Sequence, residues 1–321
     1  MEKKGPYTVR ELKNLSPGTQ FWGKYLILGK NLRKTRDGRE IIDLRIGDST
    51  GEIYSIVWES CTVNGQLEAG VVIGLLGDIG IYNQRLQVTA KRIKILEEEA
   101  GPYLKKPQAS LEELIGMFEQ MLQSIADPYL KELLQRVFNP ETRTRFFQAP
   151  AAKKIHHNYY GGLLEHSLSV AGLCNKVADT YPDINRDLLL SGALMHDIGK
   201  LAEYEMDVAP NYTPEGRLLG HIVLGSELVA DKIKDMKKEG IEFPQELEWM
   251  LKHLLVSHHG SLEFGSPVLP LFTEAYILYA MDNLDARIYV FQNKIEEDDG
   301  DDKYFSKYDS FYGQHFFTYR Y

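Results

Sequence analysis

Cysteines and long apolar runs are both scarce in this chain. Only two of the 321 residues are cysteines, Cys61 and Cys174, which excludes a disulfide framework and favours small buried side chains in a reducing compartment. No run approaches the roughly 20 apolar residues of a membrane span, and the first five residues are not followed by the apolar stretch of a signal peptide. We therefore expect a cytoplasmic protein without a membrane partner.

Lys and Arg are fewer than Asp and Glu over the whole chain, but the difference is not the same in its two parts. The formal net charge is −9, yet residues 1–95 hold 15 Lys and Arg against 10 Asp and Glu. The remainder holds 22 Lys and Arg against 36 Asp and Glu. A basic front part and an acidic remainder indicate two regions of different character, and the length is sufficient for two domains.

Residues 1–98 are predicted to form a small β-barrel. Turn signals such as Asp37-Gly38 separate five β-prone segments, with a helix-sized gap between the third and the fourth. The segments are 21–32, 40–47, 52–58, 71–81 and 85–96. The arrangement resembles an OB-fold of the kind that binds single-stranded nucleic acid, in which cations follow the phosphates and aromatic faces stack on the bases.

Candidate contacts to nucleic acid gather around the first hairpin of this region. Each of these residues taken alone is more often a solvated or core side chain, but basic residues with nearby aromatic rings favour nucleic acid as a set. The cations are Lys30, Arg33, Lys34, Arg36, Arg39 and Arg85, and the stacking candidates are Trp58 and Tyr82. An OB barrel can also bind protein or sugar, so the fold alone does not fix the ligand.

Residues 99–155 are interpreted as a linker followed by connecting helices. Ser110, with Glu113 three residues later, predicts a capping box at the start of one helix. Asp127 followed by proline predicts the start of the next helix. Just beyond this segment, His157 and Tyr159 are candidates for substrate contact, because loop residues beside a site often bind.

A second motif places an imidazole and a carboxylate together at the end of an apolar run. Residues 188–194 predict a buried helix, and His196-Asp197 follows it directly. Burial of this pair is costly unless a partner such as a divalent metal ion binds both groups. The pair alone would favour a hydrogen-bonded helix end, but further candidate ligands on other predicted helices favour a two-metal site. These are His166, His221, His258, His259 and Asp282.

This order of histidines and aspartates resembles the HD superfamily of metal-dependent phosphohydrolases over residues 156–295. The resemblance implies an all-α bundle that binds two metal ions. It assigns one ion to His166, His196, Asp197 and Asp282. Asp197 would bridge to a second ion held also by His221 and by His258 or His259, between which spacing does not choose. The histidine that is not a ligand is a catalytic candidate for proton transfer, and Lys200 is one for neutralising phosphate charge.

Together the two regions resemble the YhaM family of bacterial 3′→5′ exoribonucleases. The resemblance rests on 161–166, 196–200, 258–260 and 263–268, joined to an N-terminal barrel. It implies hydrolysis of single-stranded RNA to nucleoside 5′-monophosphates, with single-stranded DNA as a second candidate strand. The resemblance also implies two ions of manganese or a similar divalent metal, and His and carboxylate ligands without thiolates suit Mn²⁺, Co²⁺, Fe²⁺ or Zn²⁺ better than Mg²⁺. A phosphohydrolase of mononucleotides or cyclic nucleotides and a non-catalytic nucleic-acid-binding protein are the competing interpretations.

Residues 296–321 combine an acidic run with a high density of aromatic side chains. Such density favours burial against the chain itself or in a homo-oligomer contact. Because cations are sparse here, RNA binding by the tail is the weaker interpretation.

Overall fold

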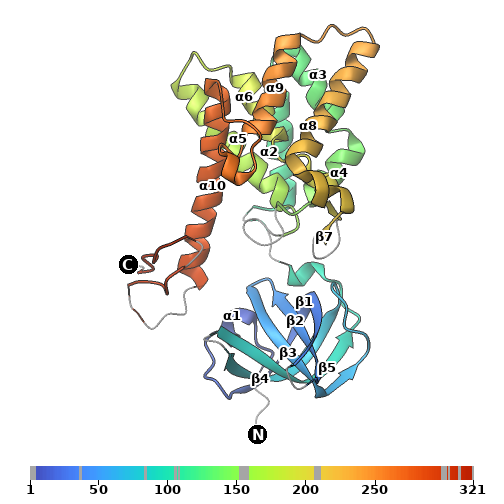
Figure 1. Cartoon of the computed structure of the whole chain (residues 1–321), viewed down its shortest axis with the longest axis vertical. Coiled ribbons are helices and arrows are strands. Elements are labelled where there is room, and N and C mark those ends of the chain that lie inside the picture. Colours follow the sequence, from blue (N-terminus) through green and yellow to red (C-terminus); the bar gives the residue numbers. More distant parts are fainter. Residues whose placement is uncertain are drawn as a thin grey trace. The chain divides into compact units, whose positions relative to one another are not determined.

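The computed structural model describes residues 5–35, 38–82, 85–104, 107, 109–151, 159–205, 211–297, 302, 304–309 and 312–319. The chain divides into two compact units, the first with described residues up to 104 and the second from 107 onwards. Figure 1 shows the first unit as strands and the second as helices. No helix among the described residues is long and apolar enough to cross a membrane.

The first unit is a closed five-stranded barrel preceded by a short helix. Its elements are α1 (Val9–Leu12), β1 (Gln20–Lys34), β2 (Glu40–Asp48), β3 (Gly51–Asn64), β4 (Val72–Tyr82) and β5 (Arg85–Leu96). The strand order around the barrel is β1-β2-β3-β5-β4. β3 pairs in parallel with β5, and every other pair is antiparallel. This confirms the predicted N-terminal barrel of OB type.

Alternation along the strands fills the barrel interior. Because successive side chains of a strand point to opposite faces, every second residue faces inward. Phe21, Tyr25, Ile73 and Val88 are at most 1% exposed and lie in one apolar cluster. The structure differs from the sequence-based prediction of the strands in the length of β3. This strand continues to Asn64 and occupies much of the helix-sized gap predicted between the third and fourth strands.

The second unit is helical and follows a short 3-10 turn, η1 (Gly101–Tyr103). Its helices are α2 (Leu111–Gln123), α3 (Pro128–Val137), α4 (Pro140–Gln148), α5 (Gly162–Thr180), α6 (Arg186–Met195), α7 (Lys200–Glu203), α8 (Pro214–Lys238), α9 (Gln245–Ser257) and α10 (Thr273–Glu297). A strand pair, β6 (Tyr204–Glu205) and β7 (Asn211–Tyr212), and the 3-10 turn η2 (Leu262–Phe264) complete it.

Local capping starts α2 and α3 where the sequence predicts. The Ser110 hydroxyl accepts from the Glu113 main-chain N–H, and the Glu113 carboxylate accepts from Ser110 N. The Asp127 carboxylate accepts from the first N–H groups of α3. Side chains of this kind satisfy the orphan donors of a first turn and contribute about 1 kcal/mol each. These helices share one apolar core with α5, α6, α8, α9 and α10.

The described part of the C-terminal tail packs on its own chain. Phe316 is 2% exposed and its ring lies 4.9 Å from that of Phe291 on α10. Lys294 forms an ion pair with Asp309 at 2.6 Å. Tyr308 and Phe317 remain largely exposed.

Candidate metal centre

Helices α5 and α6 bring His166, His196 and Asp197 into the core. His166 lies in the second turn of α5 and is buried. α6 ends at Met195, and its last eight residues are all buried. His196 and Asp197 therefore emerge from the helix end inside the protein, at 1% and 2% exposure. The apolar run in the sequence is the reason, because it buries the whole helix.

A glycine and a break in α8 position His221. A Cβ on Gly199 would lie 2.0 Å from the His221 carbonyl oxygen, so only glycine allows the loop after Asp197 to approach α8 this closely. Gly220, at φ 73°, interrupts the helical backbone of α8 immediately before His221. The freed His221 N–H donates to Glu203 Oε1 at 3.1 Å.

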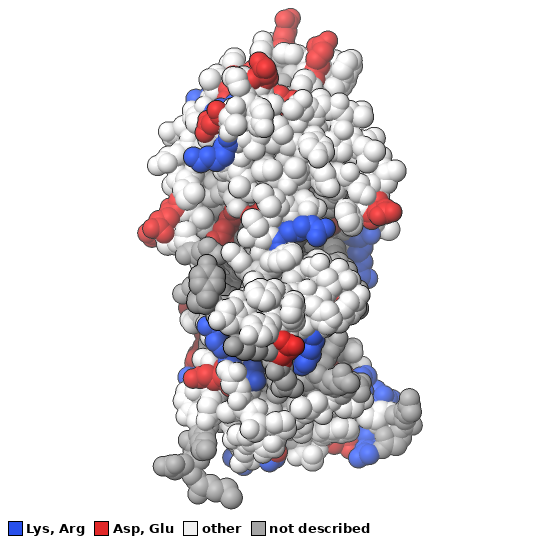
Figure 2. Space-filling view, turned by 90° about the vertical axis from the view of Figure 1, so that its left-hand side faces the viewer, with Lys and Arg blue, Asp and Glu red and all other residues white. Residues whose placement is uncertain are grey.

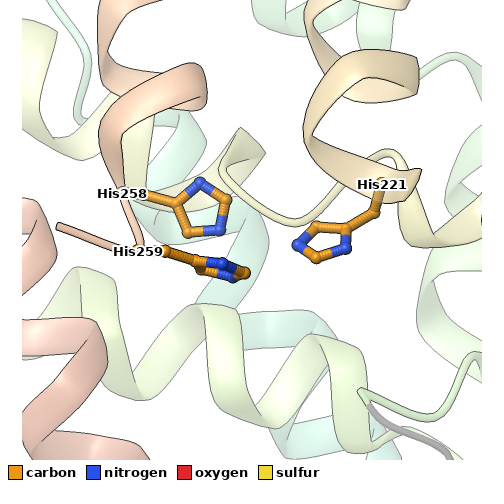
Figure 3. Close-up of side chains that lie close together, drawn as sticks. All are labelled: His221, His258 and His259. Carbon is orange, nitrogen blue, oxygen red and sulfur yellow. The ribbon is translucent and has the colours of Figure 1, made fainter. Parts of the chain in front are cut away.

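The last ligand candidates come from the end of α9 and the middle of α10. His258 directly follows α9, and His259 lies beside it, before Gly260 at φ 71°. Asp282 lies on α10. In Figure 3 the rings of His221, His258 and His259 face a common space, one from α8 and two from the end of α9.

The first cluster joins His166, His196, Asp197 and Asp282. The Nε2 atoms of the two histidines lie 3.2 Å apart. Asp197 Oδ2 is 3.3 Å from His196 Nε2, and Asp282 Oδ1 is 3.1 Å from His166 Nε2. Each ring uses its Nδ1 to donate a hydrogen bond outside the cluster, His196 to the Ala193 carbonyl and His166 to Asp285. In neutral rings the two Nε2 lone pairs would therefore face each other, which is favourable only with a cation between them.

The second cluster consists of His221, His258 and His259, and Asp197 Oδ1 lies close to the first two. Asp197 Oδ1 is 3.4 Å from His221 Nε2 and 3.8 Å from His258 Nε2. Ligand atoms of His221, His258 and His259 all lie within 4.8 Å of one another. Both members of the His258-His259 pair thus lie in this cluster, and Asp197 presents one carboxylate oxygen to each cluster.

Unpartnered buried atoms test whether this donor set fits metal ions. Among the described residues, Asp197 Oδ1, His221 Nε2 and His258 Nε2 are buried without a hydrogen-bond partner. Each such atom costs about 1–3 kcal/mol. N and O ligands about 2.1 Å from an ion lie roughly 3 Å from one another, close to the separations between these donor atoms. The residues present therefore fit divalent metal ions.

The protonation states of His258, His259 and Asp197 also suit metal binding. Burial and the neighbouring His259 hold the pKa of His258 well below its usual range, and burial with His221 lowers the pKa of His259. Burial would raise the pKa of Asp197, but Lys200 and His196 outweigh it and hold the pKa well below its usual range. Neutral imidazoles and an ionised carboxylate are the forms that bind metal ions.

Lys200 and Tyr159, which the sequence suggests as contacts to the substrate, both form hydrogen bonds to carboxylates. Lys200 Nζ donates to Asp197 Oδ2 at 2.6 Å and is 7% exposed. Tyr159 is 6% exposed and its hydroxyl donates to Glu165, so its ring presents little surface to a base. His157 lies outside the described residues.

In the barrel, a groove of about 670 Å³ brings together several of the predicted nucleic-acid contacts. Its lining includes Arg33, Lys34, Trp58 and Tyr82. The Arg39 guanidinium lies 5.8 Å from the Trp58 ring centre. Figure 2 shows Lys and Arg side chains on the visible face of the barrel, with some Asp and Glu among them, and side chains of both signs on that of the helical unit.

The predicted cations of the barrel differ in their surroundings. Lys30 pairs with Glu68 at 2.8 Å, and Arg33 is paired with Asp43. Arg36 and the side chain of Arg85 lie outside the described part of the chain. The groove therefore contains a subset of the predicted contacts.

Two carboxylates beside the clusters were not assigned from the sequence. Asp285 Oδ2 accepts from His166 Nδ1 at 2.7 Å, and Glu203 Oε1 lies 3.4 Å from His221 Nδ1. Asp285 follows Asp282 by three residues, a spacing that places both on one helix face and allows either a partner to the site or a charge at the start of the next helical turns. For Glu203 the sequence carries no comparable signal, because its contact depends on the approach of α7 to α8.

The fold and this centre define the class of the second unit. Residues 163–287 match the HD domain family, so the chain combines a closed five-stranded barrel of OB type with a helical HD domain.

Several solved structures resemble parts of this chain. The HD domain of the L. monocytogenes phosphodiesterase PgpH is 19% identical, covering 49% of this chain and 80% of that chain, with a TM-score of 0.30. The p204 HINb domain is 22% identical, covering 29% of this chain and 47% of that chain, with a TM-score of 0.25. The second OB-fold domain of replication protein A from Methanococcus maripaludis is 20% identical, covering 29% and 96%, with a TM-score of 0.23. This chain thus spans about half of the HINb chain.

Proposed function

We propose that this protein is a metal-dependent 3′→5′ exoribonuclease that hydrolyses single-stranded RNA to nucleoside 5′-monophosphates. The observation that carries the proposal is the pair of adjoining ligand clusters that share Asp197, one oxygen to each. Paired metal sites of this kind serve phosphate-ester hydrolysis. The resemblance of the sequence motifs to the YhaM family supports the 3′→5′ direction and the preference for RNA.

The residues divide into metal ligands and groups that act on the phosphate. The proposed ligands are His166, His196, Asp197, His221, His258 and Asp282, and His259 is assigned to proton transfer. When bound, two divalent ions, for which Mn²⁺ is our first choice, would supply Lewis-acid stabilisation of the scissile phosphate and a water of lowered pKa. Hydrolysis adds this water across the bond between phosphorus and the 3′-oxygen. The released nucleotide keeps the phosphate, and the 3′-oxygen of the shortened chain takes a proton.

Lys200 and His259 are the proposed groups for charge and proton transfer. The Lys200 ammonium, held against Asp197 Oδ2, adds a fixed positive charge beside the phosphate and would stabilise its developing charge. His259 donates from Nδ1 to the Phe264 carbonyl at 2.7 Å, which directs its Nε2 away from that contact. Because His259 is less buried than His258, it is the better candidate for proton transfer at the scissile phosphate.

The barrel groove supports a single strand as the substrate. Trp58 and Tyr82 offer ring faces on which bases stack, and Arg33, Lys34 and Arg39 offer charge for phosphates. A phosphohydrolase of mononucleotides would leave this groove without a role. The barrel therefore favours a polymeric substrate.

A time course on single-stranded RNA labelled at its 5′ end, with Mn²⁺, tests the proposal. The wild type should give a ladder that shortens from the 3′ end, and Asp197→Ala should leave the RNA intact. Asp179→Ala, which removes an exposed carboxylate from the same helix as His166, is the matched control and should retain activity. Intact RNA with metal-loaded wild type would refute the exonuclease and favour a small-nucleotide substrate.

A further inference from the structure

The Nδ1 atoms of the five imidazoles in the two clusters face two different kinds of hydrogen-bond acceptor. Three donate from Nδ1 to main-chain carbonyls: His196 to Ala193, His258 to Leu255 and His259 to Phe264. The other two face carboxylates instead, His166 that of Asp285 and His221 that of Glu203. One carboxylate-backed histidine belongs to each cluster.

Asp285 forms two hydrogen bonds beside the first cluster. Its Oδ2 accepts from His166 Nδ1 at 2.7 Å, and its Oδ1 accepts from the Ser169 hydroxyl. Ser169 follows His166 by three residues on α5, so one helix supplies both donors. The Asp285 side chain is 12% exposed. The His166 ring therefore lies between two carboxylates, with Nδ1 toward Asp285 and Nε2 toward Asp282.

Glu203 takes the corresponding place behind the second cluster. It ends α7 and is 6% exposed. Its Oε1 accepts from the His221 main-chain N–H at 3.1 Å and lies 3.4 Å from His221 Nδ1. The break of α8 at Gly220 leaves that N–H available, so the same carboxylate oxygen meets both the main chain and the ring of His221.

We propose that Asp285 and Glu203 are positioning residues, each of which holds one histidine in the tautomer that presents Nε2 to its own metal ion. A carboxylate behind a ligand histidine also makes the facing nitrogen a stronger donor than a carbonyl does. Because Asp285 acts on His166 and Glu203 on His221, each carboxylate tunes one ion. The inference rests on the metal centre of the proposed function and adds two residues that do not touch the metal ions themselves.

Titration of the metal-free, full-length protein with Mn²⁺, with free Mn²⁺ followed by electron paramagnetic resonance, tests this assignment. The wild type should bind two ions. Asp285→Asn, which keeps an acceptor oxygen but loses the charge, should weaken one ion about tenfold, and Asp285→Ala about a hundredfold. Glu203→Gln and Glu203→Ala should weaken the other ion in the same order. Equal weakening of both ions by either set, or unchanged binding, overturns the inference.

Glu274→Gln is the matched control. Glu274 is a buried carboxylate on α10 that accepts from Asn185 N at 2.8 Å and lies about 16 Å from Asp285 along the helix axis. The substitution removes a buried charge from the same helix and should leave both Mn²⁺ affinities within twofold of the wild type. Weakening by this control equal to that by Asp285→Asn would mean that helix stability alone explains the effect, which overturns the inference.

Nuclear magnetic resonance of the Zn²⁺-loaded protein with ¹⁵N-labelled histidine reads the tautomer directly. His166 and His221 should carry their proton on Nδ1 in the wild type. Asp285→Ala should remove the slowly exchanging Nδ1 proton of His166 only, and Glu203→Ala that of His221 only. Retention of both protons in the alanine variants overturns the inference. Neither result depends on RNA hydrolysis, so wild-type protein that binds two ions but leaves RNA intact refutes the exonuclease and leaves this inference standing.

Discussion

Replacement of Asp197 by Asn should destabilise the metal-free helical unit by about 3–5 kcal/mol. Asp197 and Lys200 are 2% and 7% exposed, and Lys200 Nζ lies 2.6 Å from Asp197 Oδ2. At an effective dielectric constant of about 20, the attraction between unit charges at this separation is about 6 kcal/mol before the cost of desolvation. Asn leaves the Lys200 ammonium buried without its counter-charge, and this unpaired charge is the reason for the loss.

Urea unfolding of the metal-free protein, followed by circular dichroism at 222 nm, measures the effect. The described helices other than the four-residue α1 and the 3-10 turn η1 lie in the second unit, so the signal reports mainly on that unit. Lys200→Met in the Asp197→Asn background removes the stranded charge. We expect the double variant to be more stable than the sum of the two single losses by about 2 kcal/mol or more.

The exposed pair Asp235 and Lys238 on α8 provides the control, because solvent screens it and its coupling should be negligible. Additive losses for Asp197→Asn and Lys200→Met, within about 0.5 kcal/mol, would refute the reasoning. Such a result would mean that water reaches Lys200 in the metal-free protein and replaces its partner.

Three other substitutions or conditions give distinct outcomes. Gly199→Ala should abolish binding of the second Mn²⁺ ion in an equilibrium titration, because its Cβ would lie 2.0 Å from the His221 carbonyl oxygen; two intact ions would contradict this. Burial would lower the pKa of His166, but Asp282 and Asp285 outweigh it and raise the pKa to about 10. Protonation of His166 therefore contributes its full stabilisation to the metal-free protein below about pH 6.5, and this stabilisation is lost as the pH rises through 10. At pH 7 Mn²⁺ must displace this proton. Calorimetry should therefore show proton release on Mn²⁺ binding and an Mn²⁺ affinity that rises with pH. Trp58→Ala in inactive protein should weaken single-stranded RNA binding by about 1–3 kcal/mol in fluorescence anisotropy, and unchanged affinity would argue against stacking in the groove.

The sequence by itself determined the local structure of this protein. β-prone segments separated by turn signals specified the five strands, and Ser110 with Glu113 specified the start of α2. The nearly continuous apolar run before His196 specified a buried helix end. These features depend on neighbours within a few residues, so periodicity and capping chemistry are sufficient to predict them.

The candidate site was only partly accessible from the sequence. The order of His166, His196, Asp197, His221 and Asp282 indicated ligands because these residue types are costly to bury without a partner. No spacing rule could show which oxygen of Asp197 faces which cluster. The choice between His258 and His259 also stayed open, and the structure brings both into one cluster.

Only the tertiary structure decided the contacts between distant segments. Asp282 meets His166 across 116 residues because α5 and α10 pack together in one core. Glu203 reaches His221 because Gly199 admits α8 and Gly220 interrupts it. Such contacts depend on how whole helices pack, and packing is set by the sum of many burial terms rather than by any local pattern.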